Sequence, residues 1–296
     1  MNLSLQDFVG KYKSQIDAGI VQELESRLQE VKEISLHLVP ILQAMRELSV
    51  GGKRLRGMLV ILGYELSGGH GGPPLREIIK AAVVMELFHL GLLIQDDFMD
   101  RDLVRRGVPT IIARYEDRHV GNFISMLAGD YTFGWGIENL SELKLEPRRV
   151  NAGMAVWGKY FTRVGYGQTL DGLDIADDET ILKILAIKSG EYSCVLPLLL
   201  GATLGGADQK LLERLEKYGM EMGWVFQLRD DWLGYDKDMM KKGKKTFATM
   251  YGKTRTEEAI VEHMTKGSIL AQSLQGQSSQ VDLMCSLVEW LGTRKN

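Results

Sequence analysis

Carboxylates gather at one point of the sequence, directly after a long apolar stretch. The segment LLIQDDFMDRDLVRRG, residues 92–107, follows the run AAVVMELFHLGLLI and places Asp96, Asp97 and Asp100 together. Residues four apart share one face of a helix, so Asp96 and Asp100 should project side by side. Neighbouring carboxylates repel one another, and a bound cation keeps them ionised. Such oxygen ligands suit Mg²⁺, which takes one or two carboxylates together with substrate phosphates.

Basic residues follow these carboxylates within one short stretch. Arg101, Arg105 and Arg106 beside a Mg²⁺-binding cluster suggest recognition of a diphosphate. The structural alternative is a solvated helix end on which Asp and Arg pair. The apolar run upstream weakens that alternative, because it places the carboxylates at the mouth of an apolar interior. His89 lies seven residues before Asp96 and shares roughly its face, although alone it would be interpreted as a semi-buried core histidine.

A second acidic cluster lies in FQLRDDWLGYDKDMMKKGKKT, residues 226–246. Asp230 and Asp231 are expected to end another apolar helix, and a lysine-rich loop follows them. Gln227 lies three residues before Asp230, on the same helical face. Two carboxylate clusters, each followed by basic residues, predict two facing halves of one site. Such a site would hold a diphosphate through metal ions and stabilise it as a leaving group. An apolar space between helices would hold the rest of the substrate.

The elements that carry these clusters are predicted to be helices. Helical periodicity recurs in residues 20–34, 37–49, 75–100 and 210–235, and clusters of Gly, Pro and Asp separate the periodic stretches. The sequence shows no fixed repeat and no low-complexity tract. We therefore expect a single all-α domain over residues 1–296, built as a bundle of about ten or more helices around a central cavity.

Composition and charge argue against several classes of protein. Of the 296 residues, 45% are hydrophobic, which is enough for a large core, and the net charge of −3 argues against a nucleic-acid-binding domain. Cys194 and Cys285 form no disulfide or metal pattern, so we expect a reduced, cytoplasmic setting. No signal peptide is recognised. The apolar run 81–94 contains Glu86 and His89 and is too short for a transmembrane segment.

The sequence resembles the trans-isoprenyl diphosphate synthases, which elongate prenyl chains head to tail. The resemblance covers roughly residues 45–250, and the motifs follow the family's order. They are GGKRLRG (51–57), ELFHLGLLIQDDFMDRDLVRRGVPT (86–110), GDYTFGWG (129–136), YGQTLDG (166–172), IKSGEYS (187–193), FQLRDD (226–231) and GKKT (243–246). The resemblance implies an isoprenoid-synthase type of all-α fold and a homodimer.

The resemblance also implies a role for each matched residue. The pocket for isopentenyl diphosphate would consist of Gly52, Lys53, Arg56, His89 and Arg106. Mg²⁺, as three ions with bound diphosphate, would be held by Asp96, Asp97, Asp100, Asp230 and Asp231. The allylic diphosphate would contact Arg105, Lys188 and Lys244. Oxygen dipoles beside the reacting carbons would come from Ser189 and Gln227, with Lys188 next to them.

Taken one at a time, these residues have structural alternatives. Lys53 and Arg56 could form a solvated turn, Lys188 could cap a helix C-terminus, and Gln227 could be a hydrogen-bonded core amide. The ordered set of motifs favours the functional roles instead. The implied reaction is ionisation of the allylic diphosphate, attack by the isopentenyl double bond, and loss of a proton to the departing diphosphate. Apolar walls would exclude water, which would quench the cation.

Product length depends on the residues upstream of Asp96. A helix rises about 1.5 Å per residue, so the positions five and eight before Asp96 lie about 7 and 12 Å along it. These positions are Gly91 and Phe88. A bulky residue here closes the tunnel in the family. Gly91 is therefore expected to leave the shallow level open, and Phe88 to stop growth at C20 to C25, most simply at geranylgeranyl diphosphate. Alternatively, Phe88 faces another helix and the floor of the tunnel lies elsewhere.

The second acidic motif departs from the family pattern. Its third Asp would fall at Gly234, and Asp236 could substitute through a bent helix end. The loop before GKKT is also short. Two alternatives therefore stay open: a non-catalytic or regulatory subunit of a hetero-oligomeric prenyl synthase, and a cyclase or head-to-head synthase of the isoprenoid fold. The intact first motif with Lys188, Ser189 and Gln227 favours an enzyme, and the GGKRLR box favours head-to-tail condensation.

Overall fold

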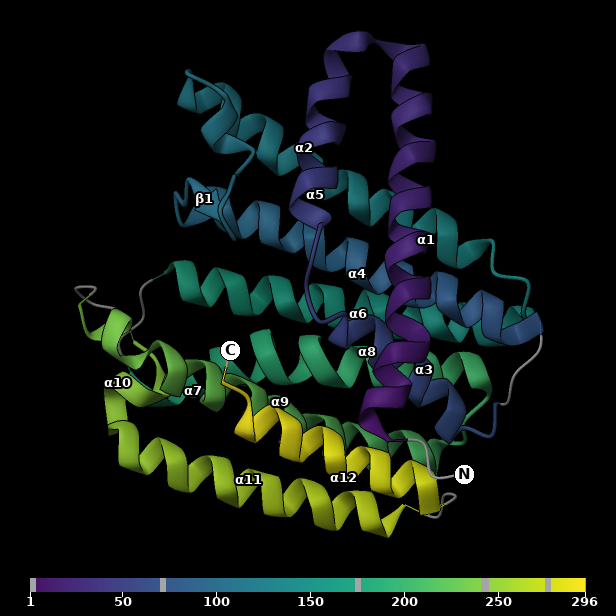
Figure 1. The fold of residues 1–296 in the computed structure, drawn as a ribbon, viewed down its shortest axis with the longest axis vertical. Helices are drawn as coiled ribbons and strands as arrows, with labels where there is room; N and C mark the ends of the chain where they lie inside the picture. The colour runs from purple at the N-terminus through teal and green to yellow at the C-terminus, as the bar shows by residue number, and fades with distance from the viewer. Residues whose placement is uncertain (1–3, 70–72, 174–176, 241–244, 275–277, 296) are drawn as a thin grey trace. The chain divides into compact units, whose positions relative to one another are not determined.

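The fold is described by a computed structural model, which covers residues 4–69, 73–173, 177–240, 245–274 and 278–295. Helices α1 to α12 account for most of these residues, and the one described hairpin has two residues in each strand (Figure 1). The prediction of an all-α protein with about ten or more helices is confirmed.

The chain falls into two compact units. The unit that carries the first acidic cluster comprises Gly10–Ile61 and Gly71–Val150, and we call it the first-motif unit. The unit that carries the second cluster comprises Met1–Val9, Leu62–His70 and Asn151–Asn296, and we call it the second-motif unit. The expectation of one domain over residues 1–296 stays a prediction.

The first-motif unit is built around the long helix α4. Its elements are most of α1 (Leu5–Ile34), η1 (Leu36–Leu38), α2 (Val39–Ser49), most of α3 (Leu55–Leu66), α4 (Pro73–Met99), β1 (Val104–Arg105), β2 (Val108–Pro109), η2 (Ile112–Arg114) and α5 (Arg118–Ser141). Figure 1 shows α1 and α2 side by side, joined through η1. Helix α4 packs along α5, and its apolar run 81–88 is fully buried.

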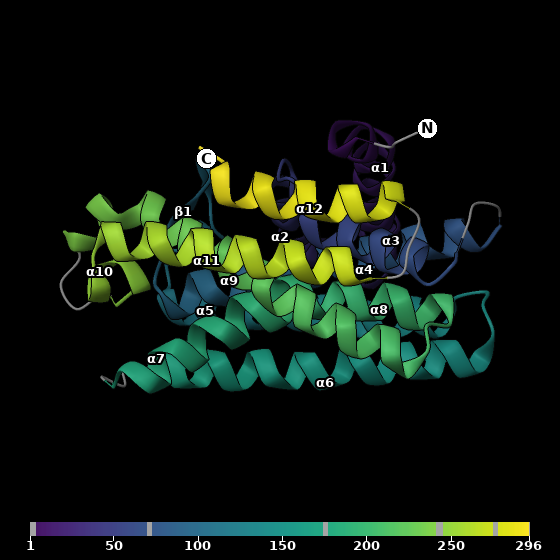
Figure 2. The ribbon, with the colours of Figure 1, turned by 90° about the horizontal axis from the view of Figure 1, so that it is seen from below.

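The second-motif unit is built around the long helix α9. Its elements are most of α6 (Pro147–Gly172), α7 (Asp178–Leu185), the π-helix η3 (Ala186–Val195), α8 (Leu196–Gly205), α9 (Gln209–Met239), α10 (Phe247–Tyr251), α11 (Lys253–Ser273) and α12 (Ser278–Thr293). Figure 2 shows these helices in layers, with α9 between α11 and α6. Helix α9 contacts η3, α10, α11 and α12, so it positions most of the unit.

Capping residues explain why several helices begin where they do. Asp117, Asp177 and Asp208 precede α5, α7 and α9, and each side chain accepts a hydrogen bond from a backbone N–H of the first turn. Such a cap stabilises a helix by about 1 kcal/mol. Gly206 ends α8 in the left-handed conformation, with φ of 88°. Asp177, Asp208 and Gly206, which lie in Gly- and Asp-rich breaks of the sequence, are thus helix caps.

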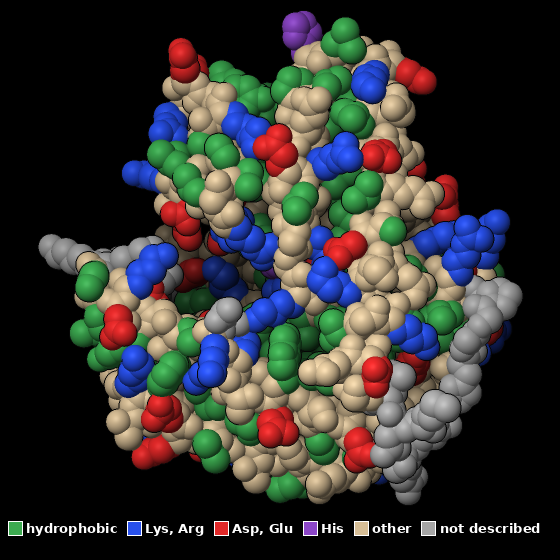
Figure 3. All heavy atoms as spheres, viewed as in Figure 1, with side chains coloured by type: hydrophobic (Ala, Val, Ile, Leu, Met, Phe, Trp, Pro, Cys, Tyr) green, Lys and Arg blue, Asp and Glu red, His purple; other side chains and the backbone are tan. Residues whose placement is uncertain are grey.

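One helical segment has the length and composition of a membrane-crossing helix. Within the described ranges it is Asp178–Gly205, and 72% of its apolar window is buried inside the protein. Core helices pass the same test, so this segment is weak evidence for a membrane span, and the expected lack of one stays a prediction. On the face shown in Figure 3, acidic and basic side chains both occur across the surface.

Candidate active site

The first acidic cluster lies at the C-terminal end of α4. Asp96 and Asp97 belong to its last turn, and the backbone N–H of Asp100 donates to the carbonyl of Asp96 at 2.8 Å. The helical spacing expected for Asp96 and Asp100 is therefore present. The side chain of Asp97 is only 3% exposed, whereas that of Asp96 is 31% exposed. Of these two carboxylates, Asp96 is the more accessible.

A hairpin turns Arg105 back toward this cluster. Arg106 and Gly107 both have positive φ, of 53° and 81°, and they form the two-residue connection between β1 and β2. Arg105 Nε donates to Asp97 Oδ1 at 2.7 Å, and its Nη2 lies 3.6 Å from Asp96 Oδ2. The RRG sequence is thus a turn that aims one arginine at the carboxylates.

Asp97 has the properties of a carboxylate that suits a cation. Burial raises the pKa of Asp97 to about 6, although the neighbouring Arg105 acts against the rise. Its Oδ2 is buried without a hydrogen-bond partner. Among the described residues, no three His, Cys, Asp or Glu side chains converge as a complete metal cage. Mg²⁺ needs only one or two protein carboxylates when phosphate oxygens supply further ligands, so this donor set fits it.

The GGKRLRG segment forms the turn that leads into α3. Gly51 and Gly52 have φ of 82° and 92°, which strongly favours glycine. A Cβ added to Gly52 would lie 3.4 Å from Arg106 Nη1 and 3.6 Å from Arg54 Nη1. The turn therefore brings its backbone up to two guanidinium groups. Lys53 is exposed and Arg56 is half-buried.

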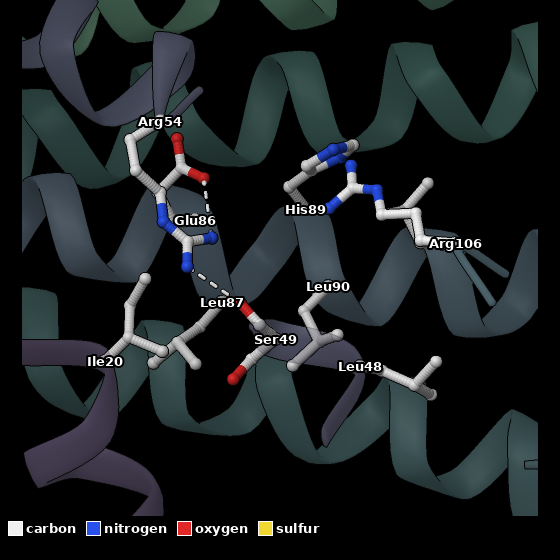
Figure 4. A pocket seen from close by; sticks show the side chains of 10 residues that line it. Ile20, Leu48, Ser49, Arg54, Glu86, Leu87, His89, Leu90 and Arg106 are labelled. Carbon is white, nitrogen blue, oxygen red and sulfur yellow. Dashed lines mark hydrogen bonds and ion pairs between the residues drawn. The ribbon is translucent and has the colours of Figure 1, made fainter. Parts of the chain in front are cut away.

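A small, partly open cavity lies beside this turn (Figure 4). Its polar wall consists of Ser49, Arg54, Glu86, His89 and Arg106. Its apolar wall consists of Ile20, Leu48, Leu87, Leu90 and Leu93. The cavity therefore combines a strongly basic wall with a short apolar wall.

Arginines dominate the electrostatics of this cavity. Burial lowers the pKa of His89 well below its usual value, and the nearby Arg56 and Arg106 lower it further. Burial also lowers the pKa of Arg106, as do neighbouring arginines, and Glu86 offsets part of this effect. His89 is therefore neutral, and the crowded guanidinium groups favour binding of an anion.

The second acidic cluster lies within α9, and the expectation that it ends the helix is wrong. Helix α9 runs unbroken from Gln209 to Met239, past Gly234, so the bend that would bring Asp236 into the motif is absent. The side chain of Asp236 is 83% exposed, and it lies 3.6 Å from Lys253 Nζ. A Cβ added to Gly234 would instead lie 3.1 Å from Asp238 Oδ2. Asp238 is thus the acidic group nearest to the missing third Asp.

A hydrogen-bonded chain connects Asp231, Gln227 and Ser189. Asp231 accepts from Gln227 Nε2 at 2.5 Å and from Phe247 N, the start of α10, at 2.8 Å. Ser189 Oγ in turn donates to Gln227 Oε1. Burial raises the pKa of Asp231 to about 6, although these donors oppose the rise. The structure therefore brings together Ser189 and Gln227, as expected, and fixes Asp231 in a position where its oxygens are already engaged.

A close helix crossing makes this chain possible. A Cβ added to Gly223 of α9 would collide with Gly190 Cα of η3, and it would lie 3.0 Å from Gly190 N. Only glycine fits where two backbones approach so closely. The adjoining Lys188 of η3 pairs through Nζ with Asp171 Oδ2 of α6 at 2.6 Å. Lys244, the last expected diphosphate ligand, lies outside the described residues.

Asp230 has a partner that the sequence did not indicate. Arg294, which follows α12, donates through Nη2 to Asp230 Oδ1 at 2.6 Å and to the carbonyl of Phe226 at 3.0 Å. Its guanidinium carbon lies 4.4 Å from the centre of the Phe226 ring. Arg229 Nε donates to the carbonyl of Arg294 at 2.8 Å. Arg294, which is distant in the sequence, thus forms a hydrogen bond with one carboxylate oxygen of the second acidic cluster.

The residues expected to set product length both face α5. The ring of Phe88 is fully buried and meets Phe133 edge to face, with ring centroids 5.5 Å apart. A Cβ added to Gly91 would collide with Thr132 Oγ1 and lie 3.0 Å from the carbonyl of Gly129. The expectation that Gly91 leaves a shallow level open is therefore wrong, because α5 fills that space. Phe88 packs against α5, and its role as the floor that stops chain growth stays a prediction.

Comparisons with known proteins agree with this assembly of motifs. The family model described as polyprenyl synthetase matches residues 39–277. A geranylgeranyl diphosphate synthase of Methanosarcina mazei is 35% identical over 239 residues, which cover 78% of this chain and 67% of the relative. A geranylgeranyl diphosphate synthase of Saccharolobus solfataricus is 30% identical over 233 residues, which cover 76% of this chain and 64% of the relative. The matched region thus spans about two thirds of these relatives' length.

Solved structures share the fold. A crystal structure of geranylgeranyl pyrophosphate synthase from Corynebacterium glutamicum, complexed with isoprenyl diphosphate and magnesium, has a TM-score of 0.84. It is 21% identical, and the match covers 99% of this chain and 100% of that chain. At this identity the similarity shows the all-α isoprenyl synthase fold. On the family match and the identity to its relatives, the chain belongs to the polyprenyl synthetase family, whose members transfer prenyl groups.

Proposed function

We propose that this protein is a Mg²⁺-dependent prenyltransferase that joins isopentenyl diphosphate head to tail with an allylic diphosphate. The observation that carries the proposal is the cavity of the first-motif unit, which sets a basic wall with His89 and Arg106 against an apolar wall of leucines. Isopentenyl diphosphate has the same two parts, an anionic diphosphate and a short apolar group. Gly52, Lys53 and Arg56 lie on or next to the turn beside this cavity and would bind the same diphosphate.

The carboxylates would hold the metal ions. Asp96, Asp97 and Asp100 of the first-motif unit and Asp230 of the second-motif unit would bind Mg²⁺, which neutralises the allylic diphosphate and makes it a better leaving group. Arg105 stands beside the first cluster, and we place the allylic diphosphate next to it. The number of ions, expected to be three, and the facing of the two clusters stay predictions.

Asp231 takes a different role in this proposal. Its oxygens accept from Gln227 and Phe247, so it would orient the Gln227 amide rather than carry a metal ion by itself. Ser189 donates to Gln227, and Gln227 donates to Asp231. The Ser189 oxygen therefore keeps its lone pairs for the substrate. Oxygen lone pairs held in this way stabilise a developing allylic cation without rearrangement. Lys188, paired with Asp171, would neutralise the departing diphosphate.

We propose geranylgeranyl diphosphate as the product, in keeping with the two relatives named geranylgeranyl diphosphate synthases. The aromatic pair of Phe88 and Phe133 would form the floor that stops chain growth. A homodimer and a cytoplasmic location, both expected from the sequence, stay predictions.

One alternative function has structural support. Gly234 replaces the third Asp of the second motif, and Arg294 occupies Asp230, which would suit a non-catalytic subunit of a hetero-oligomeric synthase. Asp238 favours the enzyme instead, because its carboxylate lies beside Gly234 and supplies an acidic group there.

A product assay separates the two functions. The protein is mixed with Mg²⁺, labelled isopentenyl diphosphate and, separately, C5, C10 and C15 allylic diphosphates, and the products are dephosphorylated and sized. We expect products that end near C20 and that disappear in Asp96→Asn. If a protein that binds Mg²⁺ and inorganic diphosphate makes no product from any primer, the enzyme proposal is wrong and the subunit function is favoured.

A further inference from the structure

Arg54 is the residue of the GGKRLR box to which the proposed function assigns no task. It is only 9% exposed, and its backbone is left-handed, with φ of 53°. A residue with a Cβ pays roughly 1–2 kcal/mol in this conformation, so the surrounding structure must hold it there. The contacts that keep Arg54 in this conformation therefore indicate its role.

Arg54 connects three helices of the first-motif unit. Its Nε donates to Asp17 Oδ1 of α1 at 2.6 Å, and its Nη2 donates to the carbonyl of Ser49, the last residue of α2, at 2.7 Å. Its Nη1 lies 3.7 Å from Glu86 Oε2 of α4 (Figure 4). The guanidinium is thus held from three sides, by two carboxylates and a carbonyl. Arg54 is therefore a connector, in contrast to Arg106.

Glu86 extends this connection to the start of α3. Its side chain is buried, and Oε1 accepts from Gly57 N at 2.8 Å. This N–H belongs to the first turn of α3 and has no partner within the helix. A Cβ added to Gly57 would lie 3.1 Å from the carbonyl of Ala82 and 3.2 Å from Glu86 Cγ, so α3 begins directly against α4. His89 follows Glu86 on α4 by three residues, about one turn.

We propose that Asp17, Arg54 and Glu86 are positioning residues for the isopentenyl diphosphate cavity. They fix the glycine turn to α4, so that Arg56, His89 and Arg106 converge on one diphosphate. Glu86 also offsets part of the repulsion among the guanidinium groups while the cavity is empty. This inference rests on the proposed function of the cavity, and it assigns to these three residues the task of holding the groups that bind the diphosphate.

The test is Glu86→Gln, with Glu77→Gln as the matched control. The glutamine oxygen still accepts from Gly57 N, but the charge opposite Arg54 is lost. Glu77 lies on the same helix, is equally buried at 6% exposure, and also holds a backbone N–H, that of Lys144 at 2.9 Å, and a cation, Lys80 at 3.0 Å. It does not line the cavity. Both variants therefore lose a buried charge that holds two partners.

We expect Glu86→Gln to raise the KM and the calorimetric Kd for isopentenyl diphosphate about tenfold, equivalent to about 1.4 kcal/mol. The kcat at saturating isopentenyl diphosphate and the KM of the allylic diphosphate should stay within about twofold of the wild type, as should every constant of Glu77→Gln. Asp17→Asn, on the half-exposed side of the connection, should change the same two constants by a smaller factor. It serves as the second variant if Glu86→Gln does not fold.

Three results would overturn the inference. In the first, Glu86→Gln and Asp17→Asn bind isopentenyl diphosphate with the same Kd as the control Glu77→Gln. In the second, kcat falls while both KM values stay unchanged, which would place Glu86 in the chemical step. In the third, the wild type binds no isopentenyl diphosphate, which would overturn the proposed function as well. The first two results leave that function standing, so the two failures are distinguishable.

Discussion

Gly91→Ala is the sharpest test of how α4 meets α5. The new Cβ would collide with Thr132 Oγ1, which cannot simply rotate away because it donates to the carbonyl of Gly129 at 2.8 Å. Overpacking of this kind costs about 1–3 kcal/mol. Loss of the Thr132 hydrogen bond costs about 0.5–1.5 kcal/mol more. The higher helix propensity of Ala returns about 1 kcal/mol. We therefore expect the free energy of unfolding to fall by roughly 0.5–3.5 kcal/mol.

The assay is urea denaturation, combined with a double-mutant cycle. Thr132→Ala removes the obstructing oxygen. In the Thr132→Ala background, Gly91→Ala should therefore lower the free energy of unfolding by at least about 1 kcal/mol less than it does in the wild type. Gly134→Ala on α5 is the control, because nothing lies within 4 Å of the added Cβ, and it should be neutral or stabilising. The sized products of Gly91→Ala should match those of the wild type. A variant as stable as the wild type that makes shorter products would refute the reasoning, since Gly91 would then face the growing chain.

Three further predictions concern the aromatic pair, the Arg294 contact and the Asp17 carboxylate. Phe88→Ala should lower the free energy of unfolding by about 3–5 kcal/mol and lengthen the product, whereas an unchanged product length would place the floor elsewhere. Arg294→Gln should lower, by up to about fivefold, the Mg²⁺ concentration needed to bind inorganic diphosphate in calorimetry, because the guanidinium competes for Asp230. A higher Mg²⁺ requirement would contradict this competition. Although burial acts to raise it, hydrogen bonds from Lys13 and Arg54 hold the pKa of Asp17 below its usual 3.8. Its stabilising effect should therefore be complete above pH 3.8 and be lost as the pH falls through the lower, folded-state pKa. Denaturation of the wild type and Asp17→Asn across this range should show their difference shrinking in acid, and a constant difference would exclude the linkage.

Local spacing predicted much of the site. The helical pairing of Asp96 with Asp100, the turn at Arg106 and Gly107, and the closeness of Ser189 to Gln227 all follow from periodicity, from turn chemistry or from the family motifs. The distance of Gly91 from Asp96 along α4 did not predict which side of the helix Gly91 occupies. At about 100° per residue, Gly91 lies about 140° around the α4 axis from Asp96. It therefore meets α5, although its height along the helix was estimated correctly.

Other features depend on residues that are far apart in the sequence. Nothing near Asp230 indicates Arg294, and nothing near Asp231 indicates that the start of α10 will use its carboxylate. Asp238 could have been found, because it lies seven residues after Asp231 and so on nearly the same helical face. The expectation of a bent helix end directed attention to Asp236 instead. The unbroken helix makes Asp238 the better candidate.

The π-helix η3 limits how this protein can change in length. From Asp178 to Gly205 the chain runs through α7, η3 and α8 without a break, and η3 is the wide form that a helix adopts around an extra residue. Deleting one residue there would restore a regular α-helix in which α7 and α8 keep their phase, but the side chains of η3 itself would face new directions. The Ser189–Gln227 pair would then be lost. We expect single-residue deletions to be tolerated less well here than substitutions, because the extra residue sets the direction of Ser189.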